Sequence, residues 1–109
     1  MYEYKEVYTL DFTNVKYYRQ IHEIIEKELD FPDYYGGNWD AFWDCLTDMV
    51  GDDPMHIEII GIDVIRNKFD DTADMIINIL RDVKHYNHDK YCDDVLIELV
   101  DGDTRTVIE

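Results

Sequence analysis

Residues 31–50 read FPDYYGGNWDAFWDCLTDMV, and they carry the clearest local signals in the chain. One proline and two glycines within residues 31–37 exclude a helix and predict a loop. Asn38 is a suitable N-cap, so a helix is expected over residues 39–50. The sequence GDDP at residues 51–54 then ends it.

The flanking segments alternate between strand and helix signals. Residues 3–10 alternate loosely and predict a strand, whereas residues 16–29 have helical spacing, with Tyr17 and Tyr18 expected on the apolar side. Further along, the patterns predict strand 56–62, a short helix 64–69, a helix from 71 or 72 to 86, strand 95–100, a tight turn at 101–103 and an antiparallel edge strand at 104–108. The order predicts an α/β fold, in which a single layer of three mostly parallel strands packs against about four helices. Residues 104–108 would add a fourth strand at the edge.

The length of 109 residues fits one domain, residues 1–109. The N-terminus has neither a basic nor an apolar region, so no signal peptide is expected. Residues 57–65 are the most apolar stretch and are too short and too polar to span a bilayer. Cys45 and Cys92 form no disulfide pattern and suggest reduced thiols. We therefore expect a cytoplasmic protein, monomeric in its free form and without a cofactor.

The charge balance is strongly acidic, with 26 acids against 10 bases and a net charge of −16. Such a charge repels phosphate backbones and anionic lipids, so neither nucleic acid nor a membrane is the expected partner. A basic protein or a cation is favoured instead. The acids are concentrated: residues 28–63 contain ten acids and neither lysine nor arginine.

The helix predicted at residues 39–50 presents acids on one side. Asp40, Asp44, Asp48 and Thr47 share a face opposite the apolar positions Phe42, Cys45, Leu46 and Met49, and Trp43 lies at the margin. On spacing alone, a solvated face with acids near the helix N-terminus is the favoured explanation of this pattern. A binding surface for a cationic partner is the alternative.

The helix predicted up to residue 86 carries a second unusual stripe. Met75, Ile79, Asp82 and Tyr86 lie opposite its core positions and combine apolar, acidic and aromatic groups. This composition suits a patch that faces a partner. A second contact within the core remains the alternative.

Other sites are weaker candidates. His85, His88, Asp89 and Cys92 do not have the spacing of a zinc site, and acids on one helix face cannot surround a hard cation, so no metal is expected. Gly36 and Gly37 precede a helix N-terminus, but the acids nearby argue against an anion there. Asp40 and Asp44 could serve a hydrolase only within a concave pocket.

The sequence PDYYGGNWDAFWDCLT at residues 32–47 resembles the signature of the barstar family, intracellular inhibitors of barnase-type ribonucleases. The similarity extends back through Ile21 and His22 and, more weakly, forward to Leu80–Asp82 and Cys92–Asp93, covering roughly residues 18–100. It implies a three-stranded parallel sheet packed against helices. It also implies that the loop and helix enter the basic active-site cleft of a ribonuclease, where carboxylates replace RNA phosphates.

The resemblance assigns partner contacts residue by residue. Asp44 would be the central anion and Asp40 its neighbour one turn earlier. The loop and helix would contribute Tyr34, Gly36, Asn38, Trp39, Trp43 and Thr47, and the second helix would contribute Ile79 and Asp82. The sequence departs from the family at Gly37, Trp39, Met49 and Asp82, where the family has an acid, leucine, tryptophan and glutamate. The chain also continues past the family's last strand.

Three functions therefore compete. The first is an immunity protein that inhibits a basic secreted ribonuclease. The second is an enzyme that uses Asp40 and Asp44 as acid and base. The third is a barstar-like module that binds another basic protein or toxin.

Overall fold

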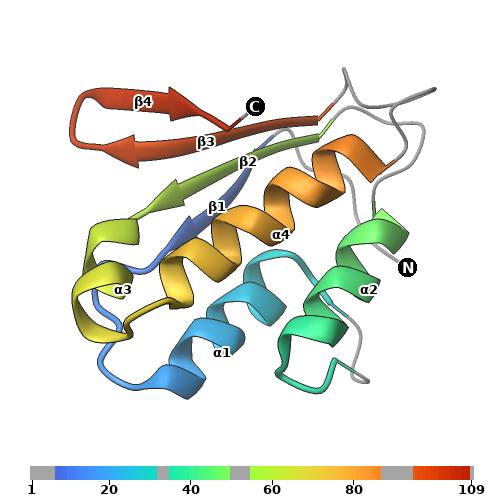
Figure 1. The fold of residues 1–109 in the computed structure, drawn as a ribbon, viewed down its shortest axis with the longest axis horizontal. Coiled ribbons are helices and arrows are strands. Elements are labelled where there is room, and N and C mark those ends of the chain that lie inside the picture. The colour runs from blue at the N-terminus through green and yellow to red at the C-terminus, as the bar shows by residue number, and fades with distance from the viewer. Residues whose placement is uncertain (1–6, 32–34, 50–54, 87–94, 109) are drawn as a thin grey trace.

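The computed structural model describes residues 7–31, 35–49, 55–86 and 95–108 (Figure 1). Over these residues the chain forms an α/β fold of four strands and four helices. Their order is β1 (Tyr8–Asp11), α1 (Tyr18–Glu28), α2 (Trp39–Met49), β2 (Met55–Ile60), α3 (Ile62–Lys68), α4 (Thr72–Tyr86), β3 (Val95–Asp101) and β4 (Thr104–Val107). The predicted succession of elements is confirmed.

The four strands form one sheet in the order β1-β2-β3-β4. The first three are parallel, and β4 pairs with β3 in the antiparallel direction after a turn at Gly102 and Asp103. The predicted fourth edge strand is therefore present. The residue that follows it, Ile108, is buried and donates its backbone N–H to the carbonyl of Ile97 at 2.8 Å. The C-terminal strand is thus anchored to the core.

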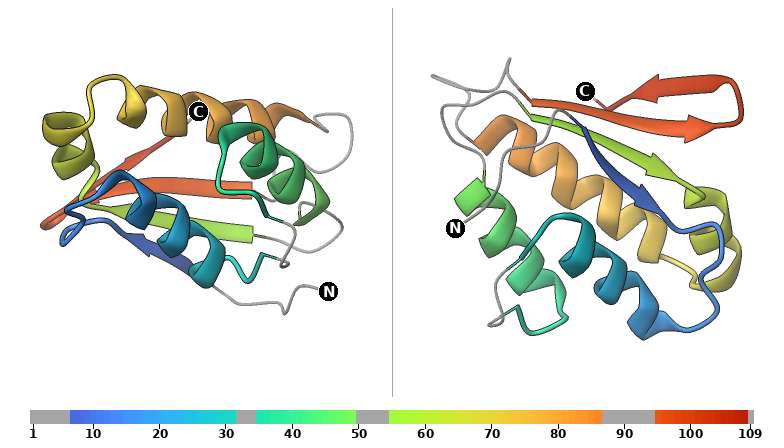
Figure 2. Two further views of the ribbon diagram at one scale, coloured as in Figure 1. Left: turned by 90° about the horizontal axis from the view of Figure 1, so that it is seen from below. Right: turned by 180° about the vertical axis from the view of Figure 1, so that it is seen from behind.

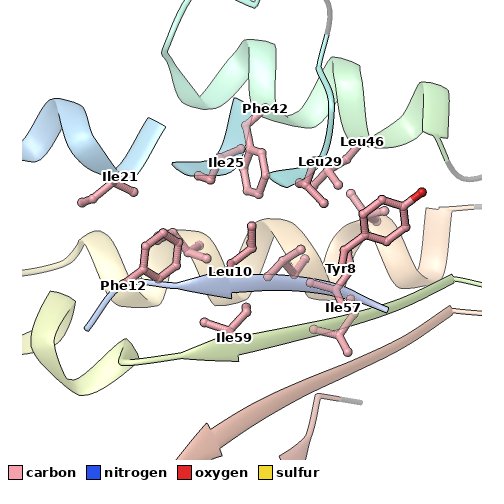
Figure 3. Close-up of a cluster of buried hydrophobic side chains, with 14 of the residues drawn as sticks. Tyr8, Leu10, Phe12, Ile21, Ile25, Leu29, Phe42, Leu46, Ile57 and Ile59 are labelled. Atoms are coloured by element: carbon pink, nitrogen blue, oxygen red, sulfur yellow. The ribbon is translucent and has the colours of Figure 1, made fainter. Parts of the chain in front are cut away.

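Burial alternates along the strands because the helices cover one face of the sheet (Figure 2). Residues of one parity, such as Leu10, Ile57 and Ile97, are fully buried. Figure 3 shows Leu10 and Ile57 beneath side chains from α1 and α2, among them Ile25 and Phe42. The residues of the opposite parity form an open face that no described helix covers.

Several predicted boundaries were shifted. The strand predicted at 56–62 ends at Ile60, because Gly61 adopts a left-handed conformation (φ 81°). Gly61 is the N-cap of α3, which starts at Ile62, two residues before the predicted start at residue 64. The expectation that Tyr17 and Tyr18 face the core was wrong: their exposed fractions are 61% and 44%. They lie at the first turn of α1, where the Gln20 side chain accepts the backbone N–H of Tyr17 at 2.9 Å. Tyr17 is thus the N-cap residue of the helix rather than a core residue.

None of the helices in the described parts of the chain is both long and apolar enough to cross a bilayer.

Candidate protein-binding site

Helix α2 begins as its sequence predicts. Asn38 Oδ1 accepts the backbone N–H of Ala41 at 2.8 Å, which is the hydrogen bond of an N-cap. Phe42, Cys45 and Leu46 are buried on the inner side of the helix. This orientation leaves the opposite face of α2 to solvent.

The outer face of α2 is acidic and exposed. Asp40, Asp44 and Asp48 are all solvent-exposed, and none forms an ion pair with another described residue. Thr47 is half-buried beside them and donates its hydroxyl to the backbone carbonyl of Asp44 at 3.0 Å. We call Asp40, Asp44 and Asp48 the acidic face. Its carboxylates are available for charge-assisted hydrogen bonds from a cationic partner.

The loop that precedes α2 is held in place by a hydrogen bond to α1. Tyr35 is buried, and its hydroxyl is hydrogen-bonded to Nδ1 of His22 at 2.5 Å. Burial lowers the pKa of the His22 imidazole and raises that of the Tyr35 hydroxyl, so both groups are held in their neutral forms. Gly36 and Gly37 follow as exposed residues. The loop therefore presents its backbone to solvent over a rigid aromatic base.

Gly37 illustrates one departure from the family pattern. Its φ of 67° lies in the left-handed region, where glycine is favoured over a residue with a side chain. The conformation of this loop thus explains a glycine where the family resemblance has an acid.

Trp39 is the second departure, and it is partly used inside the molecule. Its indole N–H donates to the Tyr18 hydroxyl at 2.9 Å, and its ring lies 4.4 Å from that of His22, centroid to centroid. Trp39 and Trp43 are both half-buried and pack against the core. Trp39 therefore attaches the start of α2 to α1. Contact of Trp39 and Trp43 with a partner remains a prediction.

Helix α4 lies against α2 (Figure 1). Asp82 and Met75 are exposed, whereas Ile79 is half-buried and packs against the core. Both interpretations of this stripe thus apply in part: Ile79 contributes to packing, and Asp82 is free to reach solvent.

Other predicted residues lie outside the described residues. These are Tyr34 of the predicted contacts, Gly51–Pro54 at the predicted end of the helix, His88, Asp89 and Cys92 of the weak metal candidate, and the side chains of Met49 and Tyr86. The residues of the predicted site that the structure describes lie on the loop, on α2 and on α4.

The residues that support the site were not all found from the sequence. His22 belongs to the matching motif, but nothing in its spacing indicated that it would hold Tyr35 from thirteen residues away. Tyr18, predicted to be a core residue, instead holds Trp39. The one available signal was a histidine beside the apolar stripe of an amphipathic helix.

The arrangement also bears on catalysis. Carboxylate-pair hydrolases place their two groups across a substrate cleft. Asp40 and Asp44 instead project from successive turns of one exposed helix face. This geometry suits recognition of an extended cationic surface rather than acid–base chemistry.

Comparison with known proteins agrees with the sequence motif. The family model described as Barstar (barnase inhibitor) matches residues 5–98, which extend from before β1 into β3. A Bacillus subtilis (strain 168) protein named "Putative ribonuclease inhibitor YrdF" is 32% identical over 81 residues, which are 74% of this chain and 85% of that protein. The chain belongs to the barstar family.

Proposed function

We propose that this protein is an intracellular inhibitor of a basic secreted ribonuclease, and that it acts as an immunity protein for the cell that makes the nuclease. The family description and the name of the B. subtilis relative support inhibition of a ribonuclease. The observation that carries the proposal is the acidic face of α2, three exposed carboxylates without an ion pair to any described residue.

The mechanism is competition for the cationic groups of the nuclease. An active site that binds RNA needs lysine and arginine to hold phosphates. In the proposed complex the Asp44 carboxylate occupies the centre of that cleft and Asp40 lies one helical turn away. The arginine and lysine side chains of the nuclease donate charge-assisted hydrogen bonds to them. RNA is then excluded because its own phosphates would need the same donors.

Rigidity of the site supports tight binding. The Asn38 cap and the Trp39–Tyr18 hydrogen bond fix the start of α2, and the His22–Tyr35 hydrogen bond fixes the preceding loop. A surface that is ordered before binding loses little conformational entropy in the complex. Asp82 on the neighbouring α4 supplies a further carboxylate for the rim of the interface.

Residence in the cytoplasm belongs to the same proposal. A nuclease destined for secretion endangers the RNA of its producer before export. An inhibitor present in the same compartment binds it there. The net charge of −16 favours rapid capture of a basic protein from solution.

The test is inhibition of a panel of small secreted ribonucleases, basic and acidic, by the purified full-length chain. RNA cleavage is measured with wild type and with Asp44→Ala, a variant that is expected to keep the fold because the Asp44 side chain is exposed. We expect stoichiometric inhibition of at least one basic enzyme by wild type and strong loss of inhibition with Asp44→Ala.

Failure to inhibit any basic ribonuclease would contradict the proposal. Affinity capture from the native cell then distinguishes the alternative. Recovery of a basic protein without nuclease activity, released by Asp44→Ala, would identify the chain as a barstar-like module for another partner. RNA cleavage by the isolated chain itself would indicate an enzyme.

A further inference from the structure

The open face of the sheet carries a cluster of metal-ligating side chains. His56 and Glu58 are two residues apart on β2, so their side chains lie on the same face of the sheet. Glu98 lies on β3 directly beside Glu58 in the strand register. One ligand atom from each residue lies within 4.8 Å of the other two. The three side chains are largely buried, with exposed fractions of 26% for His56, 17% for Glu58 and 13% for Glu98. They therefore converge on one point instead of pointing separately into water.

A positive charge already occupies this point. Arg105 projects from β4 onto the same face, where its guanidinium forms ion pairs with Glu58 and, at 3.2 Å, with Glu98. Glu98 also accepts a hydrogen bond from Nε2 of His56 at 2.6 Å. The arginine lowers the pKa of the Glu58 carboxyl through its hydrogen bond. The cluster thus binds a cation within the protein itself.

We infer that His56, Glu58 and Glu98 form a binding site for a divalent transition-metal ion such as Zn²⁺, with Arg105 as the internal cation that the metal displaces. One imidazole nitrogen and two carboxylate oxygens are a ligand set that zinc accepts, and water completes the coordination. Two carboxylates and a neutral imidazole balance the charge of a divalent ion, whereas the single charge of Arg105 leaves the cluster at −1.

The geometry allows the exchange. Tetrahedral zinc ligands are roughly 3.3 Å apart, so His56 Nε2 and Glu98 Oε1 need only separate slightly from their hydrogen-bonded distance. Arg105 is 52% exposed and lies on the edge strand, so its side chain can rotate into solvent. The metal would then join β2 to β3 in place of the arginine contact from β4.

The cluster differs from the acidic face of α2 in both ligand chemistry and position. The acidic face offers carboxylates from one helix, without an imidazole. The cluster lies on the sheet face opposite the helices. The inference therefore does not depend on the proposed inhibition of a ribonuclease, and either can fail alone.

Calorimetric titration of the full-length, chelator-treated protein with ZnCl₂ tests the inference, with MgCl₂ as a hard-cation comparison. We expect one Zn²⁺ per chain, little heat with Mg²⁺, and a melting temperature that rises with Zn²⁺ and returns with chelator. His56→Ala and Glu98→Gln should each weaken Zn²⁺ binding by at least about tenfold. Arg105→Gln should tighten it by about fivefold, because one competing positive charge is removed.

The double variant His85→Ala, His88→Ala is the matched control, because it removes two histidines that are not part of the cluster, His85 on α4 and His88 three residues later in the sequence. It should bind Zn²⁺ like wild type. Binding that is lost in this control but kept in His56→Ala would overturn the inference, as would weaker binding in Arg105→Gln. Circular dichroism of each variant establishes whether the variant is folded, so that a loss of Zn²⁺ binding is not mistaken for unfolding. Ribonuclease inhibition by the chelator-treated protein should equal that by the untreated protein, so the metal-binding result is independent of the proposed function.

Discussion

Two acidic regions among the described residues differ in whether their charges have a partner within the protein. On the outer face of α2, Asp40, Asp44 and Asp48 are exposed and form no ion pair with a described residue. On the open face of the sheet, Glu58 and Glu98 are largely buried and share Arg105. Carboxylates are thus paired with an arginine in one region, whereas in the other they have no counter-ion among the described residues.

The difference follows from the cost of each arrangement. Partly buried carboxylates gain more from a charged partner, because water solvates them less. Exposed carboxylates at i and i+4 cost a helix only about a few tenths of a kcal/mol. A chain with a net charge of −16 can therefore keep an uncompensated surface at small expense to its stability. Such a surface is informative about function because nothing in the fold requires it.

Replacement of Asp44 with alanine gives the largest effect that this comparison predicts. We expect binding to the nuclease to weaken by well over about 2 kcal/mol, the threshold of an interface hot spot, because the cations of the partner stay buried and unpaired. An aspartate of barstar itself is a standard example of an extreme hot spot, so the size of the effect rests on family resemblance and not on the geometry. Asp40→Ala, Asp82→Ala and Tyr34→Ala should follow with smaller losses. Titration calorimetry against the nuclease measures all four.

The matched control for Asp44 is Glu58→Gln, which removes one negative charge from the compensated region. It should bind the nuclease like wild type and unfold at a lower denaturant concentration, since Arg105 loses a partner. Asp44→Ala should do the reverse: unchanged or slightly higher stability, from relief of repulsion with Asp40 and Asp48, and poor binding. An Asp44→Ala protein that unfolds but binds normally when folded would make Asp44 a structural residue.

The next largest effect is expected from salt concentration, which should act on the exposed charges of the acidic face. The proposed attraction between the acidic face and a basic cleft acts through solvent, so the association rate should drop at least about tenfold between low salt and about 0.5 M, with a smaller change in the dissociation rate. Stopped-flow mixing at several salt concentrations gives both rates. The double variant Asp40→Asn, Asp48→Asn should flatten the dependence. An association rate that does not depend on salt concentration would show that the acidic face does not contribute to association.

Sequence alone predicted the acidic face but not the compensated cluster. The face follows from helical periodicity within residues 39–50, where a local pattern decides which side chains are exposed. The cluster depends on the register between β2, β3 and β4, which brings His56 and Glu98 together across 42 residues. Alternation in β2 places His56 and Glu58 on one face, but no local pattern tells which strand lies beside them. The His22–Tyr35 contact was missed for the same reason.

Between pH 5.5 and pH 8 the pH dependence of stability should originate at His22, beneath the binding loop. Burial lowers the His22 pKa from 6.5 in the folded state, so the unfolded chain binds this proton more readily. Its contribution to the free energy of unfolding is complete above pH 6.5 and decreases as the pH falls toward the lowered pKa. Tyr18, Tyr35 and Trp39 contact the ring, and Arg19, Glu23 and Glu26 line the same hollow.

Urea unfolding between pH 8 and pH 5.5 measures this dependence. His22→Gln should remove most of the slope with pH, at some loss of stability at pH 8. His85→Gln, which changes an exposed histidine on α4, should keep the slope of wild type. An unchanged slope in His22→Gln would place the titrating group elsewhere.

The smallest effect on inhibition is expected from acids that are far from the acidic face of α2. Asp101 ends β3 and Asp103 lies in the turn to β4, at the end of the molecule away from α2 (Figure 1). Asp101→Asn with Asp103→Asn changes the net charge from −16 to −14, the same change that Asp40→Asn with Asp44→Asn would produce. Charges farther apart than the Debye length of about 8 Å at physiological salt barely interact, so the terminal pair should leave inhibition within about twofold of wild type. The pair on α2 should abolish most of it. Inhibition constants measured side by side at physiological salt thus distinguish the position of the charge from its total. Equal losses in the two double variants would mean that net charge alone drives binding, and a larger loss in the terminal pair would put the C-terminal hairpin in the interface.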